Sequence, residues 1–302
     1  MSNECIVQKL KSSVSGDLRK AGEARFYTRA SAFTYLNAEN SILKILTPGV
    51  TFQNTGYVGA TEQPCMGGSG RSIQTSDACD IQILTRYGLK NLSGGYTAIN
   101  LDELAFCENL EILECNWNAS SGSIENFENN TVIKSLKAEG EIEGDLSHLF
   151  TSSACYTFST SFNEGTHSNI TGDISNFSKI PNVVNLYHRN AVGLYGNVSV
   201  FNGGFSLLRN IDLSGCPNVT GNISAFANHA LQKLLLGNSG VTGHLVDAIT
   251  GNTALAFIWA PAGVQYTDAD AAIVDALLAS NGATIRPDGH YFAGGTRVDS
   301  YT

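Results

Sequence analysis

Long apolar runs are absent from this 302-residue chain. No stretch approaches the roughly 18 uncharged apolar residues that a membrane helix needs, so we expect no membrane insertion. The first twenty residues, MSNECIVQKLKSSVSGDLRK, also lack the apolar core of a secretory signal. We therefore expect either that the protein is not exported by the usual route or that a signal segment was removed from it. With 42% hydrophobic residues, the chain can still bury a sizeable core.

Basic residues are also scarce. Lysine and arginine total 18 against 27 aspartates and glutamates, which gives a formal net charge of -9. Because neutralising phosphates requires a basic face, this balance excludes nucleic acid as the expected partner. The first 30 residues are the exception and could form a docking arm or the charged face of a capping helix. Their basic residues are Lys9, Lys11, Arg19, Lys20, Arg25 and Arg29.

Motifs that carry catalysis are missing as well. The chain has no GxSxG nucleophile motif and no HExxH metal pair. The segment GGSGRS at 67–72 lacks the lysine and the spacing of a phosphate-binding loop, so we interpret it as a flexible loop. Asp268 and Asp270 stand near an expected helix start, where the helix dipole explains them better than acid-base chemistry does. The sequence therefore predicts no enzyme activity, no cofactor and no metal site.

The seven cysteines form no CxxC pair. An odd number without paired spacing indicates neither a disulfide framework nor a zinc site, so we expect reduced thiols. Cys115 and Cys155 stand at inward positions of the repeat described next. A free cysteine acts there as a small hydrophobic residue.

What the chain does contain is one phrase repeated six times. It is clearest as LLRNIDLSGCPNVTGNISAF at 207–226 and recurs as LQKLLLGNSGVTGHLVDAI at 231–249. Both have the form Leu-x-x-Leu-x-Leu, a polar turn, and then Val-x-Gly-x-Ile or Val-x-Gly-x-Leu. Neighbouring units lie 22 to 28 residues apart, a period that predicts a solenoid of stacked units. The turn glycines are Gly122, Gly144, Gly172, Gly196, Gly221 and Gly243.

Each unit would place its Leu, Ile and Phe side chains inward, and its short strand would pair with the strand of the next unit. The turn glycine would supply a backbone conformation or a close approach that a Cβ obstructs, with the Val or Ile two positions earlier packing below it. Two positions depart from the pattern. His188 stands where the last leucine of the fourth strand belongs, and the seventh strand, LAFIWA at 255–260, lacks a glycine turn and is expected to be terminal.

From Leu101 to Ala260 these repeats resemble the leucine-rich repeat family. VTGNI at 219–223 and ITGDI at 170–174 are similar to the variant with a second short strand on the convex side. NLDELAFCENLEIL at 100–113 further resembles the lead-in of leucine-rich repeat proteins from gut bacteria and their phages. The resemblance implies an α/β-type, strand-rich solenoid with few helices that binds other proteins.

We predict three regions along the chain. Residues 1–79 lack the period and would form a small β-rich cap or docking domain, residues 80–260 the repeat region, and residues 261–302 a C-terminal cap. The cap would consist of a helix that begins after Thr267 and a hairpin around 287–289. The elements expected in the first region are a helix through Ile6, Leu10 and Val14 and strands at 25–30, 41–46 and 50–53.

Residues between the inward positions of each strand point to one shared sheet face. Along this face the composition changes from polar to aromatic toward the C-terminal end. Because aromatic and arginine side chains are enriched in binding hot spots, we predict a contact surface there. A second interpretation stays open, in which Tyr291 and Phe292 cover Phe257 and Trp259 as part of the cap core. The predicted contact residues are Tyr187, Arg189, Asp212, Lys233, Leu235, Phe257 and Trp259.

The sequence thus favours a non-catalytic binding or structural module with a protein partner. The resemblance to repeat proteins of phages implies a virion or tail-associated component involved in host attachment, which would be cytoplasmic before assembly. The alternative is a bacterial surface or secreted leucine-rich repeat protein that binds a host protein or glycan.

Overall fold

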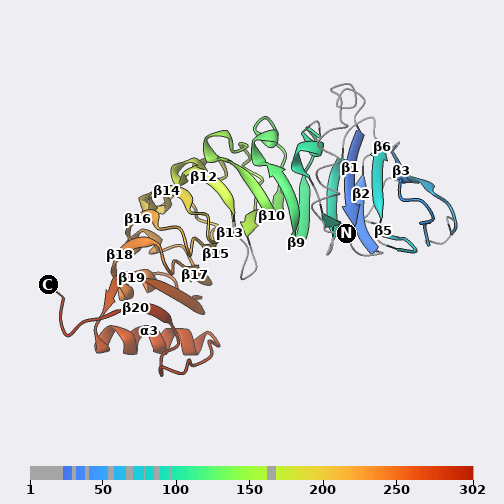
Figure 1. The fold of residues 1–302 in the computed structure, drawn as a ribbon. Coiled ribbons are helices and arrows are strands. Elements are labelled where there is room, and N and C mark those ends of the chain that lie inside the picture. The colour runs from blue at the N-terminus through green and yellow to red at the C-terminus, as the bar shows by residue number, and fades with distance from the viewer. Residues whose placement is uncertain are drawn as a thin grey trace.

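The computed structural model describes residues 23–28, 32–37, 41–53, 58–65, 71–77, 79–84, 89–94, 97–98, 100–105, 107–161 and 168–301. The expected helix through Ile6 and Val14, most of the basic segment, and residues 66–70 of the glycine-rich loop lie outside these ranges. In the part described, strands stack side by side into a curved array (Figure 1). An antiparallel sheet lies at its N-terminal end and helix α3 (Asp268–Ser280) at the other.

Five strands of the N-terminal region form a separate antiparallel sheet. Their order in space is β4-β3-β6-β1-β8. The strands expected at 25–30 and 41–46 are present as β1 and β3, whereas 50–53 contributes only an isolated bridge between Phe52 and Thr75. The bounds are β1 Glu23–Thr28, β3 Ser41–Ile45, β4 Glu62–Cys65, β6 Asp80–Leu84 and β8 Thr97–Ala98.

Three further N-terminal strands extend the repeat sheet instead. β7 (Leu89–Gly94) pairs in parallel with the first strand of the repeats. β2 (Ala32–Asn37) then pairs antiparallel with β7, and β5 (Arg71–Gln74) antiparallel with β2. Parallel stacking therefore begins at Leu89, and the N-terminal strands cover the end of the column that would otherwise be exposed.

The repeats form two rows of parallel strands, an inner row on the concave side of the array and an outer row on the convex side (Figure 1). Three long strands run through both rows: β9 Ile112–Ser123, β10 Ser135–Asp145 and β19 Phe257–Tyr266. The other inner strands are β11 Thr157–Ser161, β13 Asn185–His188, β15 Asn210–Asp212 and β17 Lys233–Leu235. The other outer strands are β12 Asn169–Asp173, β14 Gly193–Asn197, β16 Asn218–Asn222 and β18 Gly240–His244. The chain folds as a leucine-rich repeat solenoid with the second, convex row of strands that the x-Gly-x-Ile segments implied.

Each outer strand is followed by a short 3-10 turn that carries the chain back toward the inner row. These turns bury apolar residues such as Ile124, Ile174 and Phe226 against the column. A similar turn, η1, precedes β9. The turns are η1 Leu101–Leu104, η2 Ile124–Phe127, η3 Leu146–His148, η4 Ile174–Lys179, η5 Val198–Phe201, η6 Ile223–Phe226 and η7 Leu245–Ile249.

A glycine and a capping residue stand before each turn from η2 to η6. The caps are Ser123, Asp145, Asp173, Asn197 and Asn222, and each side chain accepts the backbone N–H two residues later at 2.8–3.1 Å. The six glycines have φ angles of +95° to +127°. At Gly172, Gly196, Gly221 and Gly243, an added Cβ would lie only 2.5–2.8 Å from the cap oxygen of the preceding unit. The predicted obstruction is confirmed, and the obstacle is the preceding cap.

The inward positions form one continuous column, as the repeat predicted. Its centre is a run of phenylalanines in which neighbouring ring centroids lie 5.1–6.5 Å apart. Each fully buried phenylalanine contributes roughly 1.5–3 kcal/mol by leaving water, so this run is a large part of the stability of the column. The buried rings are Phe150, Phe158, Phe177, Phe201, Phe205 and Phe226.

His188 replaces a leucine inside this column. Its side chain is fully buried, and its ring stacks on Phe177 with centroids 5.4 Å apart. Nδ1 lies 2.7 Å from the Thr160 hydroxyl, while Nε2 has no hydrogen-bond partner among the residues that the structure describes. Burial lowers the pKa of His188 from 6.5 to about 3, so the ring is neutral at physiological pH.

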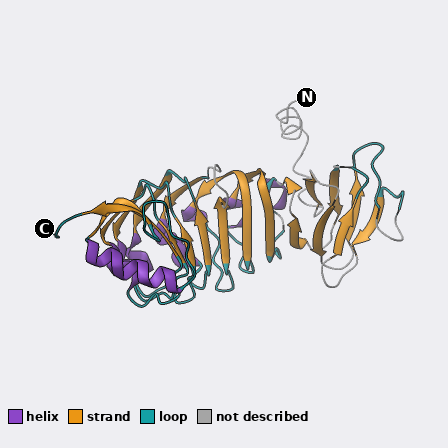
Figure 2. Ribbon diagram, turned by 90° about the horizontal axis from the view of Figure 1, so that it is seen from below, coloured by secondary structure: helices purple, strands orange, loops and turns teal. Residues whose placement is uncertain are grey.

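The C-terminal cap consists of α3 and one strand, β20 (Ala293–Arg297). Thr267 and Asp270 form a capping box at the predicted start of α3, which buries Ala271, Val274 and Leu278. The predicted hairpin is wrong. A turn forms at Arg286–Gly289, but α3 carries the chain back across the end of the stack (Figure 2), so β20 enters parallel to β19. Nowhere in the described chain is a helix long and apolar enough to cross a membrane.

We expect Gly221→Ala to lower the free energy of unfolding by about 2 kcal/mol or more, because the new methyl group must displace the Asn197 cap at a strained φ. Gly203→Ala is the matched control, since Gly203 has a φ of +72° but no atom within 4 Å of an added Cβ. It should cost only about 1 kcal/mol. Urea denaturation measures both values, and equal losses would show that the cap contact is unimportant.

The buried neutral histidine predicts a specific acid sensitivity. The unfolded chain takes up a proton at His188 below about pH 6.5, but the folded chain does so only near pH 3, so stability falls as the pH falls through this window. Between pH 7 and pH 5, we expect the free energy of unfolding to fall by about 2 kcal/mol less in His188→Leu than in the wild type. Exposed His148, replaced by Gln, serves as the surface control. Parallel urea titrations at the two pH values test this, and identical slopes for wild type and His188→Leu would contradict it.

Candidate functional site

The residues predicted as a contact surface lie together on the inner row. In the strand pairing, Tyr187, Asp212, Leu235 and Trp259 stand at one level of β13, β15, β17 and β19. Asn185, Asn210, Lys233 and Phe257 stand level with one another two residues earlier on the same strands. Since neighbouring strands are about 4.8 Å apart, the two levels form a continuous surface at the C-terminal end of the row.

The level of Tyr187 is largely closed to solvent. Asp212 and Leu235 are only 2% and 5% exposed. Asp212 accepts hydrogen bonds from Arg189 Nε at 3.0 Å and from the backbone and hydroxyl of Ser214. Burial and the nearby Asp212 carboxylate raise the pKa of Tyr187 to about 12, which keeps its phenol neutral. In this level, Asp212 holds Arg189 in place, and Leu235 is buried.

The level of Phe257 is open. Phe257 is 42% exposed, and Lys233 Nζ lies 5.8 Å from the centroid of its ring, within range of a cation–π contact. Phe292 is buried instead against Tyr266, with ring centroids 5.1 Å apart. The alternative of a cap core therefore does not hold for Phe257.

Trp259 has an intermediate position. It is half-buried, and in the strand pairing it lies beside Ala293 of β20. Its indole covers Gly237, where any Cβ would collide with the ring. The tryptophan therefore packs on the end of the stack while keeping part of its surface open on the inner row.

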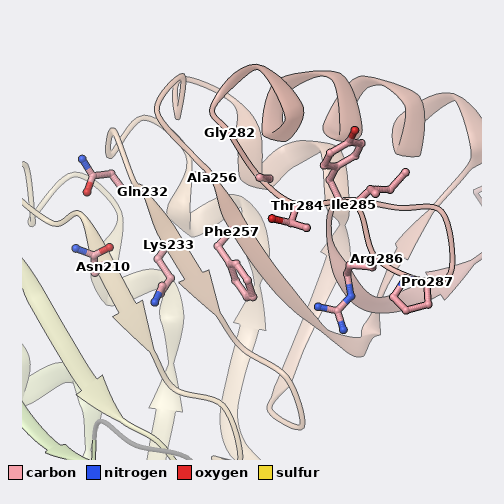
Figure 3. Close-up of a pocket in the computed structure, with 12 residues that line it drawn as sticks. Asn210, Gln232, Lys233, Ala256, Phe257, Gly282, Thr284, Ile285, Arg286 and Pro287 are labelled. Carbon is pink, nitrogen blue, oxygen red and sulfur yellow. The ribbon is translucent and has the colours of Figure 1, made fainter.

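A groove of about 570 Å³ opens next to Phe257, between the inner row and the chain that follows α3 (Figure 3). Its size is typical of sites that hold a small ligand or a few residues of a peptide. The sequence predicted Lys233 and Phe257 on the floor of this groove but not its second wall, which consists of residues that were expected to pair as a hairpin. The lining residues are Asn210, Gln232, Lys233, Ala256, Phe257, Gly282, Ala283, Thr284, Ile285, Arg286, Pro287 and Tyr291.

The groove wall is fixed to the cap by hydrogen bonds. Asp275 of α3 accepts the Tyr291 N–H at 2.7 Å and lies 2.8 Å from His290 Nδ1. At the other end of the wall, Asn281 donates to the carbonyl oxygens of Thr253 and Leu255 at 2.9 and 2.8 Å. Both ends of the wall are thus held without any ligand, so the groove is largely pre-formed.

In the described part of the chain, potential metal ligands are spread apart and the free cysteines are buried. No three His, Cys, Asp or Glu side chains of that part stand close enough together to hold a metal ion. Cys155 and Cys216 are buried, and burial raises the pKa of each thiol to about 12. Such thiols are protonated and unreactive at neutral pH.

No protein-family model matches the sequence, and no curated protein matches it. Among solved structures, the chain is similar to a TDR receptor at 14% identity and a TM-score of 0.39, over 55% of this chain and 28% of the receptor chain. It is also similar to an internalin from Listeria monocytogenes at 14% identity and a TM-score of 0.29, over 70% of this chain and 82% of that one. The assignment of the fold rests on the repeat and the strand pairing.

We expect Arg189→Met to destabilise the protein by about 3 kcal/mol, because it leaves the buried Asp212 carboxylate without its cation. Asp212→Asn in the same chain should restore most of this loss. Lys134→Met, which breaks the exposed pair with Glu111, should cost less than about 1 kcal/mol. Chemical denaturation of the wild type and the three variants gives these values. An Arg189→Met cost no greater than that of Lys134→Met would show that the buried pair is dispensable.

Proposed function

We propose that the protein is a non-catalytic protein-binding module and that it engages its partner at the C-terminal end of the inner row. The observation that carries this proposal is the open groove beside Phe257. An exposed aromatic ring at its floor, a pre-formed wall and a cation on each side are features of a binding hot spot rather than of a solvated surface.

We further propose that this module belongs to a phage virion or tail and serves in host attachment. The support is the resemblance of residues 100–113 to the lead-in of repeat proteins from gut bacteria and their phages. The six basic residues among the first 30 give this segment a net positive charge, opposite in sign to the acidic remainder of the chain, which would suit a docking segment, although Arg25 of the six lies in β1. The competing role is a bacterial surface or secreted protein that binds a host protein or glycan.

The binding proposal predicts that Phe257→Ser removes partner capture while leaving the fold intact. Immobilised wild-type protein and the variant would be incubated with extract from the source cells, and the bound proteins identified by mass spectrometry. Ile273→Ser is the matched control, because Ile273 is 52% exposed on α3, outside the groove. We expect the wild type and Ile273→Ser to retain the same partner and Phe257→Ser to lose it. Equal capture by all three proteins would refute the proposed surface.

The virion role has its own test. Antibodies against the protein should detect it in purified phage particles at a constant ratio to the major capsid protein. Its absence from particles, or its presence on the surface of uninfected cells, would refute the virion role and favour the bacterial one. Either result leaves the binding surface at Phe257 to be judged by the capture experiment alone.

A further inference from the structure

The charge of the groove is opposite to that of the chain. The protein carries a formal net charge of -9, yet the groove lining contains two cations, Lys233 and Arg286, and no carboxylate. The two cations come from different walls, Lys233 from β17 and Arg286 from the chain after α3, and Phe257 lies between them (Figure 3). The groove is therefore a local positive site on an acidic surface.

Both cations remain available to a partner. Lys233 contacts the Phe257 ring, and the Arg286 side chain makes no hydrogen bond or ion pair with any residue that the structure describes. The carboxylates on the flanking elements are engaged elsewhere: Asp212 binds Arg189, and Asp275 binds His290 and Tyr291. Asp288, next to the wall, accepts the His290 N–H. The structure thus provides no internal counter-ion for Arg286 within the described chain.

Between the cations, the groove offers apolar surface. Phe257 and Ile285 are 42% and 57% exposed, from opposite walls, and Tyr291 is half-buried beside them. Exposed aromatic and aliphatic side chains that line one recess are suited to hold an apolar side chain of a partner. Gln232, whose side-chain amide has no hydrogen-bond partner in the described chain, also lines the groove and could pair with a peptide unit.

We infer that the groove binds an acidic peptide segment in which one apolar side chain is flanked by carboxylates. The apolar side chain would lie against Phe257 and Ile285, and the carboxylates would pair with Lys233 on one side and Arg286 on the other. Arginine binds a carboxylate through two parallel N–H groups, which fixes the orientation of the segment. This inference rests on the proposed function and specifies the chemistry of the partner.

The test uses the full chain and a defined probe. The probe is a fluorescein-labelled peptide, blocked at both ends, with one phenylalanine between two glutamates on each side. We expect saturable binding by fluorescence anisotropy, and an affinity about tenfold lower for Arg286→Glu and for Lys233→Glu. Lys90→Glu is the matched control, because it makes the same charge change at an exposed site outside the groove and should leave the affinity unchanged. Circular dichroism would confirm that all variants are folded.

Two further peptides separate charge from apolar contact. A peptide with lysines in place of the glutamates should not bind, and one with serine in place of phenylalanine should bind at least about tenfold more weakly. Ile285→Ser should lower the affinity for the glutamate peptide without changing the salt dependence of binding, whereas Arg286→Glu should reduce that dependence. Equal binding of the glutamate and lysine peptides, or the absence of saturable binding, would overturn the inference.

Failure of this inference and failure of the proposed function are distinguishable. Partner capture that depends on Phe257 but is unaffected by Arg286→Glu would refute the acidic peptide and leave the binding module in place. Capture unaffected by Phe257→Ser would refute the proposed surface even if the peptide binds. If sedimentation equilibrium detects a dimer that Arg286→Glu dissociates, the occupant is a second copy of this chain, and the peptide assignment is wrong.

Discussion

The contact between a capping side chain and the glycine of the next unit is the constraint on which the rest of the structure depends. The cap satisfies a backbone N–H at the start of a 3-10 turn, and its oxygen then occupies the space that a Cβ of the next unit would need. Only a glycine at positive φ fits there. Each unit thereby fixes the position and orientation of the next unit, and the outer row stays tightly packed.

This constraint also determines the surface on the inner side. Because every unit repeats the same rise, the inner strands pair without a shift from β13 to β19, and residues from four successive units arrive at one level. The Asn210 side chain donates a hydrogen bond of 2.8 Å to the Asn185 side chain on the neighbouring strand. The regular pairing of the backbone thus extends to the side chains. A binding surface assembled from four strands is thus a consequence of uniform stacking.

The end of the stack is where the constraint stops. His244, at the cap position of the last 3-10 turn in the described chain, makes no side-chain capping bond and instead stacks on Tyr301 with ring centroids 3.7 Å apart. In the next unit Val264 pairs with Gly243, as the corresponding valines do in earlier units. Tyr266, however, takes the position of the turn glycine, and Thr267 caps an α-helix rather than a 3-10 turn. The longer helix ends the column and leads into the wall of the groove. The groove therefore exists because the repeat is terminated at this point.

Most of the repeat fold was predictable from the sequence because the pattern of one unit occurs six times. The inward positions, the obstructed glycine and the Thr267 cap all follow from local pattern, and even His188 was identified as an inward residue. The seventh strand was expected to be terminal, but β20 pairs with it on its free side. For the N-terminal region, the sequence predicted that strands are present but not how they pair. Their pairing joins segments far apart in the chain, and no repeat reveals it. The strand β2 has no signal comparable to that of the repeats, and it was missed.

The sequence by itself determined which side chains are buried and which point to the inner face, because strand alternation and the repeat period decide this locally. Only the tertiary structure decided which of the outward residues are accessible. It buried Asp212 and Leu235 and left Phe257 exposed. It also placed Arg286 and Ile285 on the other wall of the groove. The physical reason is that exposure depends on what packs from the next strand and from the chain beyond α3, and those contacts join residues that no local pattern relates.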